Sequence, residues 1–238
     1  ENIRFFEGEK ANCKDLGAKL AGLGDIYVFD AFGTAHREQA STHSAIECAS
    51  IACAGLLLEK ENKFLTKALK NNESPFLAVI GGAKVSSKLE LIKHINSQAD
   101  HIIVGGGIAN TFLKAKGFDI GKSLFEDSMI DIASNLIKEG KIILPKTVVT
   151  STTFEGKNVK ESSVSQVGNN EMILDLRLEE ETVALLECAN TILWNGPMGV
   201  FENNVFEKGT KDLSLAIARS KAFSIAGGGE TLSAVNKY

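Results

Sequence analysis

Two lysines follow a pair of glycines in the stretch GGAKVSSK, residues 81–88. The stretch comes directly after the apolar run FLAVI, which is typical of a buried strand. Lys84 and Lys88 are four residues apart, the spacing that places two side chains on one face of a helix. Glycine turns expose backbone N–H groups, and N–H groups next to ammonium groups bind phosphate. The spacing therefore favours a phosphate site at the end of this strand.

The elements that would position these lysines repeat along the second half of the chain. Strand-like segments at 75–82, 99–107, 191–199 and 221–229 alternate with helical patterns, and residues 141–151 read as a further strand interrupted by Pro145. Such alternation predicts an α/β fold with an open parallel sheet and helices on both faces, a Rossmann-like three-layer arrangement.

Glycines end four of these predicted strands, and parallel strands share one carboxyl edge, where ligands bind. The clusters are Gly81–Gly82, Gly105–Gly107, Gly196 with Gly199, and Gly227–Gly229. Each cluster alone is equally consistent with a tight turn between a strand and a helix. Four clusters on one edge, one of them carrying paired lysines, favour a ligand that bears phosphate.

The first seventy residues follow a different pattern. Residues 24–37 read as a strand that enters a loop containing His36 and Arg37, and Arg37 is a candidate to bind an anion. From residue 47 to residue 70 the pattern is helical, and we expect one long helix with a break near Gly55.

Composition excludes several classes of protein. A net charge of −4 and a pI of about 5.7 give no basic footprint for nucleic acid. No apolar run approaches the ~20 residues of a membrane span, and the first residues resemble no signal peptide, so we expect a cytoplasmic protein. The four cysteines and four histidines show no metal-ligand spacing. Trp194 and the 13 phenylalanines are interpreted as core residues.

Two familiar phosphate-binding motifs are absent. The stretch GFDIGKS (117–123) has three residues between its glycines where a Walker A loop has four, and it follows a predicted helix. In GGGIAN, Asn110 stands where a Rossmann fingerprint has its third glycine. Glu230 and Thr231 follow the last glycine cluster and are equally consistent with capping of the next helix.

The motifs taken together resemble those of phosphoglycerate kinases. ENIRF, DAFGTAHR, GGAKVSSKLELI, GGGIANTFL, WNGPMGVFE, KGT and SIAGGGET occur in the family's order, and the resemblance covers essentially all 238 residues. It implies a two-domain glycolytic kinase that moves a phosphoryl group between 1,3-bisphosphoglycerate and ADP, giving 3-phosphoglycerate and ATP with Mg²⁺. It also implies a cytoplasmic monomer.

By this resemblance, residues 1–55 are the end of the 3-phosphoglycerate domain, residues 56–74 an interdomain helix and hinge, and residues 75–238 the nucleotide domain. Arg4 and Arg37 would bind 3-phosphoglycerate, and Lys84, Gly228 and Gly229 would be catalytic. Glu202 would bond the ribose, and Glu230, which replaces the family's usual Asp, would contact Mg²⁺ carried by the nucleotide. The implied nucleotide-binding residues are Gly82, Ala83, Lys84, Lys88, Gly106, Asn195, Glu202, Gly228, Gly229, Glu230 and Thr231.

By the family's pattern the chain also lacks the first part of the N-terminal domain and the last glycine-rich loop. We therefore expect these 238 residues alone to turn over negligibly. The alternative reading is a nucleotide-binding module without catalysis. A sugar-phosphate-binding α/β protein would explain the glycines but not Glu202 after WNGPMGV.

Removal of the Lys88 ammonium tests the phosphate interpretation of GGAKVSSK. We expect Lys88→Ala to weaken binding of Mg·ADP by about 1–3 kcal/mol, the scale of a lost hydrogen bond to a charged group. Calorimetric titration measures this change. An unchanged affinity would indicate that Lys88 lies on the solvated face of a helix and does not contact phosphate.

Overall fold

The structure is a computed structural model that describes residues 2–70 and 72–238. Its contacts divide the chain into two compact units, Glu1–Lys67 and Ala68–Tyr238. The finer boundaries expected at residues 55 and 74 stay a prediction. Within the described residues, no helix is both long enough and apolar enough to cross a membrane.

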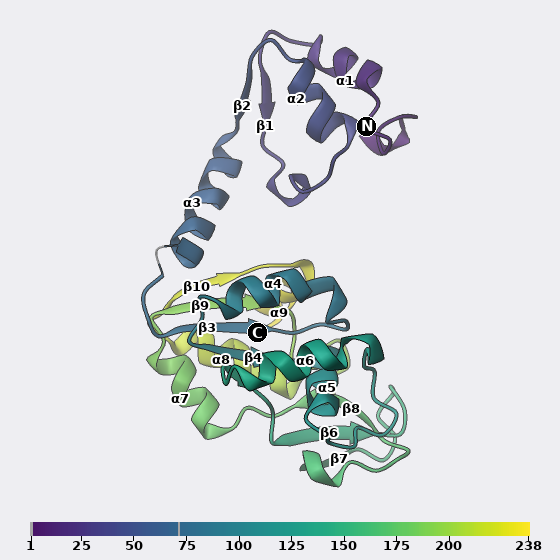
Figure 1. The fold of residues 1–238 in the computed structure, drawn as a ribbon, viewed down its shortest axis with the longest axis vertical. Helices are drawn as coiled ribbons and strands as arrows, with labels where there is room; N and C mark the ends of the chain where they lie inside the picture. The colour runs from purple at the N-terminus through teal and green to yellow at the C-terminus, as the bar shows by residue number, and fades with distance from the viewer. Residues whose placement is uncertain (1, 71) are drawn as a thin grey trace. The chain divides into compact units, whose positions relative to one another are not determined.

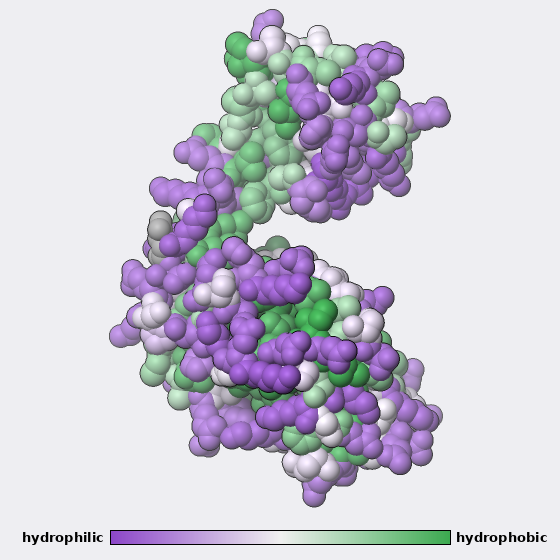
Figure 2. Space-filling model, viewed as in Figure 1, coloured by the Kyte–Doolittle hydropathy of each residue, from purple (hydrophilic) through white to green (hydrophobic). Residues whose placement is uncertain are grey.

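The first unit contains a short parallel sheet and helices (Figure 1). Its elements are α1 (Lys14–Ala21), β1 (Tyr27–Phe29), α2 (Ala45–Cys48), β2 (Ala52–Ala54) and α3 (Leu56–Lys70), which continues into the second unit. β1 and β2 pair in parallel, with Tyr27 opposite Ala52. Val28 on β1 and Ile51, which precedes β2, are exposed apolar side chains. Figure 2 shows green, hydrophobic surface on the first unit. Exposed apolar area of this kind is typical of a packing surface.

The helix expected over residues 47–70, with a break near Gly55, is wrong in its first part. α2 ends at Cys48 and β2 follows, so that α3 begins only after Gly55, where the break was expected. The Gly55 N–H donates to Phe29 O at 2.8 Å and extends the pairing with β1. Asp30 Oδ1 accepts from Leu58 N at 2.7 Å in the first turn of α3. Strand pairing thus outweighs the helix propensity of an alanine-rich segment.

The second unit is built on a parallel sheet, which confirms the predicted fold class (Figure 1). Within residues 72–238 this sheet has five strands in the order β10-β9-β3-β4-β5, all parallel. The strands are β3 (Phe76–Ile80), β4 (His101–Val104), β5 (Ile142–Ile143), β9 (Thr191–Asn195) and β10 (Phe223–Ala226). Every residue of β3 is buried, as expected for a central strand covered on both faces.

Helices flank this sheet. They are α4 (Leu89–Asn96), α5 (Gly106–Ala115), α6 (Ile130–Lys138), α7 (Glu180–Cys188), α8 (Lys208–Arg219) and α9 (Gly229–Lys237). The crossovers β3–α4–β4 and β9–α8–β10 run in opposite directions across the sheet. Because such crossovers are right-handed, α4 and α8 cover opposite faces.

A second, antiparallel sheet was not predicted. Its strands, in the order β7-β6-β8, are β7 (Lys160–Ser163), β6 (Thr147–Ser151) and β8 (Met172–Leu176). The single strand expected over 141–151 is therefore wrong: β5 lies in the parallel sheet and β6 in the antiparallel one. Pro145 stands between them, and a proline has no N–H to continue a ladder.

The interpretation of all phenylalanines as core residues is also wrong. Phe5, Phe6 and Phe154 are 76%, 57% and 58% exposed. Trp194, in contrast, is 2% exposed and lies in the main core with Phe76.

The predicted glycine clusters do lie at one edge of the parallel sheet, where the turns after β3, β4 and β9 approach one another closely through main chain. A Cβ added at Gly81 would lie 1.9 Å from Pro197 O, and one at Gly107 would lie 2.3 Å from Ala83 O. A Cβ added at Gly196, whose φ is 107°, would lie 2.3 Å from Gly81 O. Only glycine permits this approach of the turns.

Substitution at this edge tests the main-chain contact. We expect Gly81→Ala to lower the free energy of unfolding by about 3 kcal/mol, since the new methyl group meets backbone that cannot move aside. Gly229→Ala is the control, because a Cβ there meets nothing within 4 Å. Urea unfolding of both variants provides the comparison, and equal stabilities would refute the tight contact.

Candidate functional site

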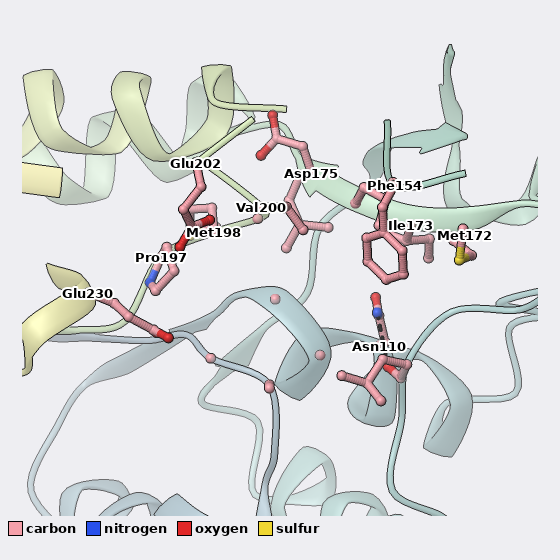
Figure 3. Close-up of a pocket in the computed structure, with 18 of the residues that line it drawn as sticks. Asn110, Phe154, Met172, Ile173, Asp175, Pro197, Met198, Val200, Glu202 and Glu230 are labelled. Atoms are coloured by element: carbon pink, nitrogen blue, oxygen red, sulfur yellow. Dashed lines mark hydrogen bonds between the residues drawn. The ribbon is translucent and has the colours of Figure 1, made fainter. Parts of the chain in front are cut away.

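A cavity of about 380 Å³ lies at the carboxyl edge of the parallel sheet (Figure 3). It is lined by the turn after β3, the start of α5, β8, the loop after β9 and the start of α9. Among its residues are Gly82, Ala83, Gly106, Asn110, Phe154, Ile173, Glu202 and Glu230. Its volume is in the range of small-molecule sites.

The two ends of the cavity differ in character. Figure 3 shows Glu230 at one end and Phe154, Ile173 and Met172 at the other. At the first end α9 begins at Gly229, after Gly228 at a φ of 95°, and no side chain caps it. Uncapped N–H groups at a helix N-terminus attract anions, so this end suits phosphate and the other suits an apolar ring.

Lys88 is turned toward the strand ends. Its Nζ donates to Gly81 O at 2.6 Å and to Asn195 O at 3.0 Å. Burial lowers the pKa of Lys88, and the nearby Glu230 carboxylate acts against that shift. The ammonium therefore lies among main-chain carbonyls beside the cavity, and the solvated-face reading does not describe it.

Lys84 does not share a helix face with Lys88, contrary to the expectation. A 3-10 turn, Ser86–Lys88, precedes α4, so Lys84 stands before any helix and is exposed. The turn forms because Glu126 accepts hydrogen bonds from the N–H and the hydroxyl of Ser86, at 2.8 and 2.5 Å. These contacts compete with extension of the helix toward residue 84.

Asn195 and Thr231 fasten the walls of the cavity. Asn195 Nδ2 donates to Gly227 O at 2.9 Å, which joins β9 to the loop before α9. Thr231 Oγ1 is buried and accepts from Gly196 N at 2.7 Å. The hydroxyl of Thr231 thus holds the adjacent loop, and it does not cap α9.

Apart from Lys84, the nucleotide-site residues expected from the sequence fall into two groups. Gly82, Ala83, Gly106, Glu202 and Glu230 line the cavity. Lys88, Asn195, Gly228, Gly229 and Thr231 belong to the strand ends and the helix start that border it.

The two arginines belong to the first unit. Arg4 lies exposed in the 3-10 turn Ile3–Phe5. Arg37 is half-buried and follows the 3-10 turn Phe32–Thr34.

Several lining residues were not predicted. Phe154, Met172 and Ile173 come from the antiparallel sheet and its loops, which the sequence did not reveal. The apolar run MILDL, residues 172–176, is the signal that could have indicated β8. Asn110 was noted only as a departure from a glycine motif.

Asp175 holds the start of α8, and its neighbour Leu174 holds the loop that forms one wall. The carboxyl group is fully buried, and Oδ2 accepts from Gly209 N at 2.9 Å and from Arg177 at 2.5 Å. On the same strand Leu174 O accepts from Val200 N at 2.8 Å. Burial raises the pKa of Asp175 to about 6, against the hydrogen bond from Gly209 and the charge of Arg177.

The described residues offer no ready-made metal centre. They contain no group of three or more His, Cys, Asp or Glu side chains that could hold a metal ion. Of the three carboxylates in the lining, Asp175, Glu202 and Glu230, only Glu230 lies at the N-terminus of α9. A divalent cation that arrives bound to phosphate needs only one or two protein carboxylates, so this donor set fits a metal that accompanies a ligand.

The raised pKa of Asp175 gives a pH dependence of stability. Folded Asp175 binds its proton near pH 6 and the unfolded residue near 3.8, so the folded state holds more protons between these values. Stability from this residue therefore rises as the pH falls from 7 to 4, by up to about 3 kcal/mol. Urea unfolding at several pH values measures it, with Asp175→Asn as the reference that lacks the titration. A difference between the two proteins that does not change with pH would contradict the assignment.

Comparison with known proteins agrees with this geometry. A family model described as "Phosphoglycerate kinase" matches residues 1–238. Phosphoglycerate kinases of Francisella tularensis subsp. novicida and Francisella philomiragia are 48% and 47% identical over 246 residues, with 100% of this chain and 63% of each relative covered. The chain thus spans 63% of the length of these curated relatives.

Solved structures give the same result. Phosphoglycerate kinase from Coxiella burnetii has a TM-score of 0.87 at 44% identity. The match covers 99% of this chain and 63% of the Coxiella burnetii chain. The enzyme from Pyrococcus horikoshii OT3 has a TM-score of 0.84 at 32% identity, with 100% and 64% covered. By sequence and by structure, this chain belongs to the phosphoglycerate kinase family.

Proposed function

We propose that the chain serves in a phosphoglycerate kinase, which reversibly transfers a phosphoryl group between 1,3-bisphosphoglycerate and ADP to give 3-phosphoglycerate and ATP. The second unit of the chain would bind Mg·ADP or Mg·ATP. The enzyme would act as a monomer in the cytoplasm. The observation that carries the proposal is the cavity at the sheet edge, with an uncapped helix N-terminus at one end and apolar side chains at the other.

The chemistry of the two ends orients the nucleotide. The phosphates would lie at the N–H groups that begin α9, near Lys88, where the positive end of the helix dipole adds to the ammonium charge. The base would lie against Phe154 and Ile173. Glu202 lines the cavity as an acceptor and would receive the ribose hydroxyls.

Phosphoryl transfer requires little covalent participation by the protein. It needs reactants held in line and negative charge spread over the transferred oxygens. Lys84 is exposed beside the glycine turn and free of the carbonyl contacts that hold Lys88, so we assign it to the transferring group. The N–H groups that follow Gly228 and Gly229 would stabilise the same charge. Mg²⁺ would arrive as part of the nucleotide, with Glu230 within reach.

The first unit would supply the other substrate site. Arg4 and Arg37 are proposed to bind the 3-phosphoglycerate anion, because guanidinium groups bind carboxylate and phosphate through paired hydrogen bonds. α3, which continues from one unit into the next, is the proposed hinge.

Calorimetric titration of Mg·ADP into the chain, with Mg·AMP as the comparison, tests the proposed nucleotide site. We expect saturable binding of ADP that is clearly weaker for AMP, because AMP lacks the β-phosphate that the helix N-terminus would receive. For the Lys88→Ala variant the matched control is Lys93→Ala, since Lys93 lies on α4 and pairs with the exposed Glu90 at 3.2 Å. Equal affinities for ADP and AMP, or no binding of either, would contradict the proposal.

A further inference from the structure

Asn110 carries an unusual buried acceptor in the lining of the cavity. It lies on α5 and is 3% exposed. Its Nδ2 donates to Leu124 O at 3.1 Å. Its Oδ1 is buried and has no hydrogen-bond partner among the described residues.

The orientation of this amide is fixed by its one hydrogen bond. A carbonyl oxygen accepts and cannot donate, so the nitrogen of Asn110 must face Leu124 O. A flipped amide would set two acceptors against each other. The oxygen is therefore held away from Leu124, and Figure 3 shows it pointing to the side of the cavity on which Phe154 and Ile173 lie.

An acceptor in this position is costly while it remains unpaired. Its neighbours in the lining include the apolar side chains of Phe154, Met172 and Ile173, which offer no donor. A buried polar group without a partner loses its interaction with water and gains nothing in return. A ligand that brings an N–H group to this end of the cavity would remove that penalty.

We propose that Asn110 selects the base of the nucleotide, through a hydrogen bond that Oδ1 accepts from the exocyclic amino group of a 6-aminopurine. The inference rests on the proposed function, which places the phosphates at α9 and the base at the opposite, apolar end. A 6-oxopurine in the same position would set its oxygen against Oδ1, and two facing acceptors repel each other.

The other polar groups of the lining do not replace Asn110. Asp175 Oδ1 is also buried without a hydrogen-bond partner among the described residues, but Figure 3 shows the Asp175 carboxylate pointing away from the side of the cavity on which Asn110 lies. Leu124 O already receives the Asn110 amide, so that carbonyl is engaged. Lys122 also lines the cavity, but its ammonium is a donor and cannot receive an amino group. Lys122→Ala is therefore a matched control that removes a polar lining side chain and leaves the acceptor in place.

Titration of three Mg²⁺-bound nucleotides into the unaltered chain provides the first test. ADP carries the amino group, purine riboside 5′-diphosphate has hydrogen in its place, and inosine 5′-diphosphate (IDP) carries an oxygen. We expect ADP to bind about tenfold more tightly than either of the others, the ratio that one buried hydrogen bond supports. Equal affinities would overturn the inference and indicate that water serves Oδ1.

The variant Asn110→Leu provides the second test, because leucine has a similar size and no acceptor. We expect the ratio of ADP to IDP affinity to fall to about one in Asn110→Leu and to stay at about ten in Lys122→Ala. A ratio that is unchanged in Asn110→Leu, with thermal unfolding showing an intact fold, would overturn the inference.

The outcomes separate this inference from the proposed function. Tight and equal binding of ADP and IDP would refute base selection by Asn110 and leave the nucleotide site standing. Binding of none of the three diphosphates would refute the nucleotide site and base selection together.

Discussion

The carboxyl edge of the parallel sheet depends on one contact, in which the turns after β3 and β9 meet through main chain alone. No side chain fits at Gly81, because a Cβ there would lie 1.9 Å from Pro197 O. Such close approach gathers carbonyl oxygens at one point, and the Lys88 ammonium lies between Gly81 O and Asn195 O. A cation among converging carbonyls offsets their mutual repulsion. The same few atoms thus set the packing of the edge and its charge.

The walls of the cavity are fixed from this edge outward. Gly106 N donates to Met198 O at 2.8 Å and Ile108 N to Gly82 O at 3.1 Å, so α5 is joined to the turns after β9 and β3. Thr231 joins α9 to the same loop through Gly196. From the antiparallel sheet, Leu174 holds the far side of that loop and Asp175 holds the start of α8. A site built on strand ends and helix starts in this way keeps its shape without a ligand.

The extent to which sequence predicted this site follows the range of the interactions. Glycines at strand ends and the apolar run 76–80 are local signals. They were enough to predict a parallel sheet and the ligand-binding edge at the carboxyl ends of its strands. The segment 47–55 was misread because its pairing with β1 is non-local. β7 is polar and exposed, so it carries no apolar alternation, and the second sheet was missed with it. Asn110 and Asp175 could not be recognised, since their roles depend on partners, Leu124 and Gly209, that only the fold brings near.

A crystal structure of the chain with Mg·ADP would test the central claim most directly, since that claim assigns opposite chemistry to the two ends of one cavity. The account predicts the diphosphate at the N–H groups that begin α9, with a phosphate oxygen within hydrogen-bond distance of Lys88 Nζ. It also predicts the base beside Phe154. A diphosphate bound elsewhere, for example at the GFDIGKS loop of residues 117–123, would contradict it, as would a base at the Glu230 end.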